Sequence, residues 1–138
     1  MKLNWMILLA AWLVAIVATA SALFIGEVMM MVPCQLCWYQ RIFMFPLAIV
    51  LGMACFSFDR RGAVYALPLA VGGLLMAAYH TLLVAGLIPK FWIPCSAGVS
   101  CADQKLEILN GIQIPWLSLV AFFTITHLLT LFLRRTPK

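Results

Sequence analysis

The sequence predicts an all-α integral membrane protein folded as a bundle of four transmembrane helices. Of its 138 residues, 66% are hydrophobic and only 9% are charged, whereas charged residues make up about a quarter of a soluble domain. A membrane helix needs about 20 mostly apolar residues. The few charged residues leave four long uncharged runs, at 3–26, 42–58, 62–89 and 108–133.

We expect one domain over 1–138, with spans at about 5–26, 37–58, 63–88 and 112–133. The first span resembles a signal peptide, but its apolar run continues through Phe24 and Ile25, so we expect it to be retained. The second run is marginal in length, and its helix must therefore begin near Cys34 or Cys37. A tight turn at 59–62 leads into the third span.

The net charge of +5 is compatible with nucleic-acid binding, but the distribution of charge favours a membrane topology instead. Six of the nine Lys and Arg residues fall on the side that holds both termini: Lys2, Arg60, Arg61, Arg134, Arg135 and Lys138. Three fall on the other side, together with three of the four acidic residues. The positive-inside rule therefore predicts cytoplasmic termini, with loops 27–41 and 88–111 facing outward.

Two spans carry stripes of small residues, which allow close helix packing in membranes. Their 4-3-4 spacing places each stripe on one helical face, so we expect both spans to pack into the bundle interior. The residues are Ala11, Ala15, Ala18 and Ala22 in the first span, and Ala66, Ala70, Gly73 and Ala77 in the third.

Four of the five cysteines fall in the two outward loops, where disulfides persist. The motif PCQLCWYQR over residues 33–41 contains a Cys-x-x-Cys pair, which can close a disulfide or share a metal. Arg41 lies four residues after Cys37, so it can sit beside that sulfur and favour the reactive thiolate, as does a helix N-terminus. A second pair, Cys95 and Cys101, permits thiol–disulfide exchange with the first.

Two histidines and one cysteine lie within the predicted spans. His80 falls near the third-span stripe, about eight residues or 12 Å from the outer end, so it should face the interior and is a functional candidate. His127, with Thr124 and Thr130 three residues to either side, indicates an interhelical polar contact. We expect Cys55 to be an inert buried thiol.

The PCQLCWYQR motif, Tyr-His-Thr at 79–81, the second cysteine pair and Ile-Pro-Trp at 114–116 together resemble the DsbB family. These bacterial proteins reoxidise a thioredoxin-fold thiol oxidase, DsbA-like, and pass the electrons to quinone; the periplasm is kept oxidising by this system. The short Cys-x5-Cys loop resembles the BdbC-type branch. Long-loop members space their outer cysteines far apart, which leaves the relay order of Cys95 and Cys101 open.

The resemblance implies that Cys34 and Cys37 pass electrons to ubiquinone or menaquinone, with Cys37 as the thiolate that contacts the ring. It implies that Arg41 and His80 support quinone binding. Cys95 would form the mixed disulfide with the partner oxidase, and Cys101 would then attack Cys34. The location implied is the bacterial cytoplasmic membrane, with the cysteines on the outer face. We expect no metal and no nucleic-acid partner, and a monomeric chain, since nothing in the sequence requires an oligomer.

Three alternatives remain at this point. The four outer cysteines can form an all-thiolate zinc site, although the five-residue spacing is unusual for one. The loops can instead be stapled by disulfides in a non-catalytic membrane protein, which would need neither Arg41 nor His80. The vitamin K epoxide reductase-like family also has a four-helix core and quinone chemistry, but its active Cys-x-x-Cys lies late in the chain.

Overall fold

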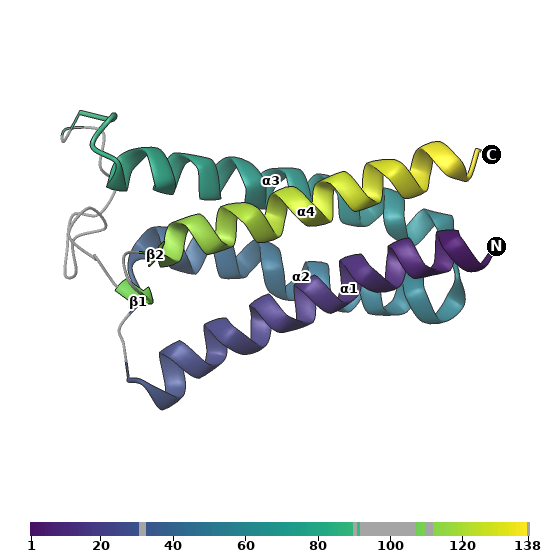
Figure 1. Cartoon of the computed structure of the whole chain (residues 1–138), viewed down its shortest axis with the longest axis horizontal. Coiled ribbons are helices and arrows are strands. Elements are labelled where there is room, and N and C mark those ends of the chain that lie inside the picture. The colour runs from purple at the N-terminus through teal and green to yellow at the C-terminus, as the bar shows by residue number, and fades with distance from the viewer. Residues whose placement is uncertain (31–32, 90, 92–106, 110–111, 138) are drawn as a thin grey trace.

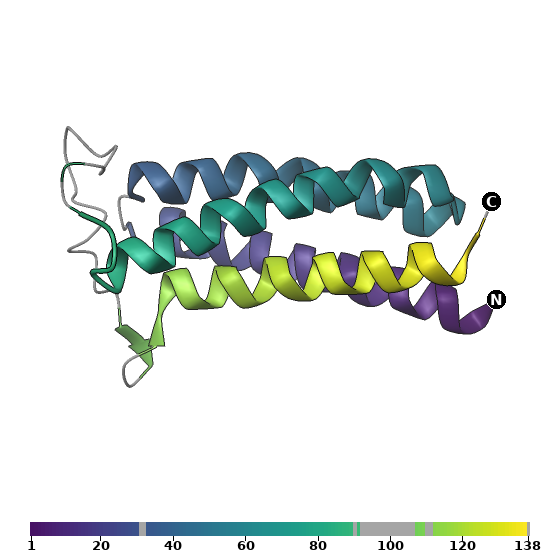
Figure 2. The same cartoon turned by 90° about the horizontal axis from the view of Figure 1, so that it is seen from above.

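The computed structural model is a bundle of four long helices whose two chain termini lie at the same end (Figure 1). Figure 2 shows the same bundle from above. The helices are α1 (Lys2–Leu23), α2 (Gln35–Ser57), α3 (Arg60–Val84) and α4 (Ile114–Arg135). The structure describes residues 1–30, 33–89, 91, 107–109 and 112–137.

Each of the four helices is long and apolar enough to cross a membrane, so the predicted fold class is confirmed. Three features depart from the expected loops. A π-helical segment, η1 (Phe24–Val28), extends α1, and two short antiparallel strands precede α4. These strands are β1 (Glu107–Leu109) and β2 (Ile112–Gln113).

The turn between α2 and α3 is shorter than the predicted 59–62 segment. Phe58 adopts a left-handed conformation (φ 49°) that ends α2. Asp59 then caps α3, because its carboxylate accepts a hydrogen bond from the backbone N–H of Arg61 at 2.9 Å. Asp is among the preferred N-cap residues, so both arginines that we had placed in the turn belong to the helix.

The other end of α3 also lies earlier than predicted, at Val84 rather than residue 88. Gly86 has a φ of 78°, its N–H donates to Leu83, and the N–H of Leu87 donates to Leu82. This pair of bonds is the Schellman arrangement, which terminates helices at a glycine. His80 is therefore only four residues, or about 6 Å, from the outer end of its helix.

The helices form a ring of neighbours in the order α1, α2, α3, α4, with α1 and α3 on one diagonal. The two small-residue stripes face the interior as predicted, since Ala11, Ala15, Ala66, Ala70 and Ala77 are fully buried. Each stripe packs against α2 and α4. Larger apolar side chains fill the bundle near the termini: Leu8, Leu51, Ile125, Leu129 and Phe132.

Candidate active site

Cys34 and Cys37 lie where α2 begins, at the end of the bundle opposite the termini. Cys34 is the N-cap residue with an extended backbone, and its carbonyl accepts from the N–H of Trp38 at 3.1 Å. The two sulfurs are 3.0 Å apart and hydrogen-bonded. Cys34 is buried at 2% exposure, whereas Cys37 is partly exposed. The pair is therefore a reduced dithiol whose sulfurs already face each other.

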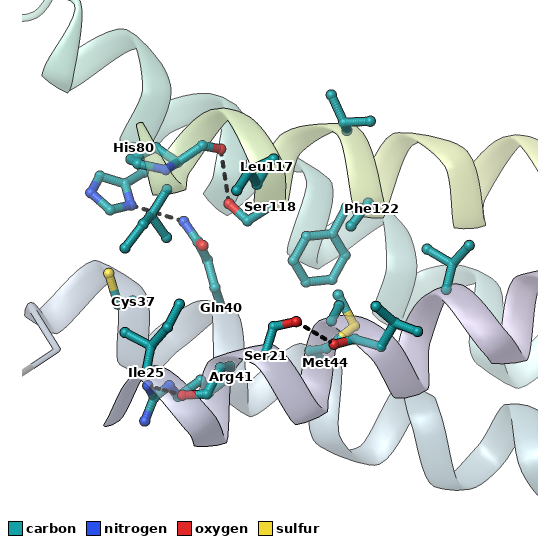
Figure 3. Close-up of a pocket in the computed structure, with 18 of the residues that line it drawn as sticks. Ser21, Ile25, Cys37, Gln40, Arg41, Met44, His80, Leu117, Ser118 and Phe122 are labelled. Carbon is teal, nitrogen blue, oxygen red and sulfur yellow. Dashed lines mark hydrogen bonds between the residues drawn. The ribbon is translucent and has the colours of Figure 1, made fainter. Parts of the chain in front are cut away.

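His80 reaches this dithiol from α3. The ring is 2% exposed, which confirms that it faces the bundle interior. Its Nε2 lies 3.8 Å from Cys34 Sγ, within the range of a hydrogen bond to sulfur. Its Nδ1 lies 3.0 Å from Nε2 of Gln40, as Figure 3 shows. Both ring nitrogens therefore have partners.

Gln40 is the site residue that sequence reasoning missed. It is buried at 7% exposure and lies three residues after Cys37, hence on the same helical face. A polar side chain on that face of a membrane helix was the available signal. Its amide carries no charge, unlike the guanidinium of the adjacent Arg41.

Arg41 lies near the dithiol, but its hydrogen bond goes to another helix. Its Nη2 donates to the carbonyl oxygen of Ala22 at 2.8 Å, and the guanidinium carbon lies 5.4 Å from the centre of the Trp38 ring. Gly26 leaves room for this group, since an added Cβ would lie 3.1 Å from Arg41 Nη2. Arg41 thus joins α2 to α1, and the sulfur partner of Cys37 is Cys34.

The electrostatics of the dithiol favour a thiolate on Cys34, at the membrane boundary. A hydrogen bond from Cys37 holds the pKa of the Cys34 thiol below its ordinary value, a bond from His80 lowers it further, and burial opposes both. Hydrogen bonds to the charged form stabilise that form. The position of Cys34 at the N-terminus of α2 acts in the same direction.

A cavity of about 620 Å³ opens beside the dithiol, between α1 and α4. Its polar end contains Cys37, Gln40, Arg41 and His80, and Cys34 is not part of its wall. The rest of the wall is mostly apolar and includes Phe122, with Ser21 and Ser118 among its few polar residues (Figure 3). Side chains at its rim are about half exposed on the outside of the bundle: Leu13, Val17, Leu117 and Val120.

The other residues singled out in the sequence are Cys95, Cys101, Cys55 and His127. Cys95 and Cys101 lie outside the described residues. Cys55 is buried at 2% exposure near the end of α2, as expected of a structural thiol. The interhelical contact predicted for His127 is wrong: the ring is exposed and stacks on Phe123 of the same helix. The hydroxyls of the flanking threonines donate hydrogen bonds to backbone carbonyls of α4 itself, as Ser and Thr side chains in helices can do.

Within the described part of the chain, Cys34, Cys37 and His80 also have the donor set of a metal site. Their ligand atoms all lie within 4.8 Å of one another. Two thiolates and an imidazole suit zinc, but such binding requires both thiols to lose their protons. The zinc alternative therefore gains a specific ligand set, different from the four cysteines considered above.

Comparison with known proteins places this site in a family. The family model for "Disulfide bond formation protein DsbB" matches residues 4–132. This chain belongs to the DsbB family. A "Probable disulfide formation protein" of Metapseudomonas resinovorans is 50% identical over 135 residues, covering 97% of this chain and 94% of that protein. No solved structure matches the chain.

Relatives with the same kind of name occur in distant bacteria. "Disulfide bond formation protein C" of Bacillus subtilis (strain 168) is 40% identical over 127 residues, with 91% of each chain covered. A "Probable disulfide formation protein" of Chlamydia muridarum (strain MoPn / Nigg) is 39% identical over 119 residues, with 86% of each covered. The predicted family is confirmed, and with it a multi-pass membrane protein of the disulfide-forming oxidoreductase class.

Proposed function

We propose that this DsbB-family chain reoxidises an extracytoplasmic, DsbA-like thiol oxidase and passes the electrons to membrane quinone. The electrons would enter at Cys95 and Cys101 and leave through Cys34 and Cys37. The chain would lie in the bacterial cytoplasmic membrane with these cysteines on the outer face. The family membership and the reduced dithiol at a membrane boundary support this proposal.

The observation that carries the quinone assignment is the composition of the cavity wall. A quinone has carbonyl oxygens on an apolar ring and an apolar tail. The cavity offers hydrogen-bond donors at one end, from Arg41 and Gln40, and mostly apolar side chains elsewhere. Its half-exposed rim gives a tail a route into lipid. The residues present therefore fit a quinone, whether ubiquinone or menaquinone.

A bound quinone would take up the two electrons and two protons that the dithiol releases on forming a disulfide. Cys37 is the sulfur on the cavity wall, so it presents the pair to that space. Arg41, held by Ala22, supplies a fixed positive charge at the same end. The apolar wall excludes water, which strengthens these polar interactions. His80 contacts the cavity from α3, next to Cys34.

The test is anaerobic mixing of purified protein with a reduced thioredoxin-fold oxidase and a soluble quinone analogue, followed by quinone absorbance. Oxidase-dependent loss of quinone, abolished by Cys37→Ser and by Cys95→Ser, is the expected result. Folded protein without turnover on either ubiquinone or menaquinone analogues would favour the stapled, non-catalytic alternative.

The role of Arg41 is separable in the same assay. Arg41→Ala should sharply slow quinone reduction, because it removes the positive charge at the polar end of the cavity. It should leave thiol exchange with the partner oxidase largely intact, as measured by trapping the mixed disulfide. Equal loss of both steps would contradict this division of roles.

One observation favours a second candidate, the zinc site formed by Cys34, Cys37 and His80. A structural zinc protein would be purified with about one metal ion per chain, and a chelator would unfold it. Metal analysis of protein purified without added metal distinguishes this candidate from the redox relay.

A further inference from the structure

A hydrogen-bonded row, Gln40–His80–Cys34, links α2 to α3 and returns to the start of α2. All three side chains are buried, at 7%, 2% and 2% exposure. Burying an unpaired polar group costs free energy. In this row each buried polar side chain is paired with the next. Nothing in the proposed quinone contacts requires Gln40 to bond to a histidine.

The atoms involved decide which tautomer His80 adopts. The nitrogen of a glutamine amide can only donate a hydrogen bond. Because that nitrogen faces Nδ1 of His80 at 3.0 Å, Nδ1 must accept and carries no proton. In a neutral imidazole the proton then resides on Nε2. That atom lies 3.8 Å from Cys34 Sγ, so the imidazole can donate only towards the sulfur.

We infer that Gln40 is a positioning residue that fixes His80 as the Nε2–H tautomer, so that His80 directs its one N–H at the Sγ of Cys34 in the reduced dithiol. This separates the roles of the two cysteines. Cys34, behind the cavity wall, is the sulfur that His80 contacts. Cys37, on the wall, is the sulfur that faces the electron acceptor. The effect of this tautomer on turnover rests on the proposed function, but the assignment of the tautomer does not.

The chemistry of disulfide closure uses this arrangement. Oxidation forms the Cys34–Cys37 S–S bond, removes both thiol protons and releases two electrons, which the proposed quinone takes up together with two protons. A hydrogen bond from the Nε2–H of His80 to Cys34 Sγ favours loss of the Cys34 proton, and the Cys37 proton is lost as the S–S bond forms. Among the described residues, other titratable or charged side chains near the pair are Arg41, one turn after Cys37, and Tyr79, which packs against the Cys34 cluster.

The first test measures the tautomer directly in otherwise unmodified protein. The chain has two histidines, and His127→Gln removes the exposed one. Ring ¹⁵N chemical shifts of the labelled, reduced, quinone-free protein, recorded well above the ordinary histidine pKa of about 6.5, report which nitrogen is protonated. We expect a protonated Nε2 and a bare Nδ1. A proton on Nδ1 would mean that the amide is reversed and would overturn the inference.

The second test follows the consequence at Cys34. In full-length protein carrying Cys37→Ala, the rate of Cys34 alkylation is measured against pH by mass spectrometry. Gln40→Met, which keeps the length of the side chain but removes its hydrogen bond, should slow alkylation at neutral pH on the order of tenfold, the effect of one pKa unit. Gln35→Met is the matched control, since Gln35 is exposed and bonds to Tyr39. It should change nothing.

A double-mutant comparison separates positioning from general damage. In a His80→Ala background Gln40→Met should have no further effect, because the residue through which it acts is absent. Equal slowing with and without His80, or no slowing in either, would overturn the inference. Neither test uses quinone or a partner oxidase, so failure of the proposed electron transfer would leave both results interpretable.

Discussion

The half of the bundle next to the termini and the half next to the dithiol are built differently from the same four helices. In the terminal half, Leu8, Leu51, Leu129 and Phe132 fill the space between helices and are fully buried. In the dithiol half, α1 and α4 border a cavity of about 620 Å³. Small residues of α1 occur in both halves. Ala15 is fully buried where the helices pack closely, whereas Ala18 and Ala22 line the cavity.

This difference separates stability from chemistry. Shortening a buried side chain in a close-packed interior lowers the stability of the fold. A side chain on the cavity wall already lacks some of those contacts, so shortening it costs less stability. Among the described residues, the buried polar side chains lie in the half where the packing opens: Gln40, His80 and Thr81. We therefore expect substitutions in the two halves to affect different measurements.

Cys37 and Cys55, near opposite ends of α2, provide the largest contrast. Cys37→Ala should reduce quinone turnover to background, since it removes one sulfur of the dithiol, while leaving the free energy of unfolding within about 0.5 kcal/mol. Cys55→Ala, in the terminal half, should do the opposite: turnover persists and stability falls by about 1 kcal/mol through lost packing. The measurements are the anaerobic quinone assay and denaturant unfolding in detergent.

The outcome that would break the contrast is loss of turnover in folded Cys55→Ala protein. Such a result would mean that the terminal half communicates with the dithiol rather than only supporting it.

Gly73 lies at the junction of the two halves and should affect both measurements. An added Cβ would overlap the ring of Phe122 on α4, and Phe122 is fully buried and also lines the cavity. Gly73→Ala should therefore cost about 1–3 kcal/mol of stability through overpacking and also raise the KM for quinone, as the ring is pushed towards the cavity. Unfolding and steady-state kinetics measure the two effects.

A matched control is Gly86→Ala, because no atom of the described residues lies within 4 Å of a Cβ added there. It should lose stability through its positive φ alone and leave the KM unchanged. A KM that rises equally in both variants would show that the effect of Gly73 is not specific to Phe122.

Much of this architecture follows from the sequence. Uncharged runs fix the number of helices, since only an apolar helix satisfies its backbone in lipid, and the small-residue stripes identify the inward faces of α1 and α3. The predicted end of α3 is four residues too late, because Gly86, whose Schellman bonds end the helix, lies within an uncharged run. The tight turn before α3 is confirmed, but it is shorter than 59–62 because Asp59 caps the helix.

The site was predictable only in part. The Cys-x-x-Cys spacing and the small-residue face located Cys34, Cys37 and His80, because helical periodicity and covalent chemistry are local properties. The partner of Arg41 was not predictable, since it is a backbone carbonyl of α1, nineteen positions earlier in the chain. Likewise, the Gln40–His80 bond joins residues forty positions apart, and a pairing of this kind depends on how α2 and α3 are rotated against each other.

The smallest effect that we expect tests how firmly Arg41 must be held. At Gly26, an added Cβ would lie 3.1 Å from Nη2 and 3.3 Å from Nη1 of Arg41, so Gly26→Ala should displace the guanidinium by a few tenths of an ångström and keep its charge. A severalfold rise in the quinone KM, with kcat and stability nearly unchanged, would show that Arg41 acts through its position. An unchanged KM in Gly26→Ala, beside a large loss in Arg41→Ala, would show instead that its charge alone suffices and that the bond to Ala22 serves only to join α1 to α2.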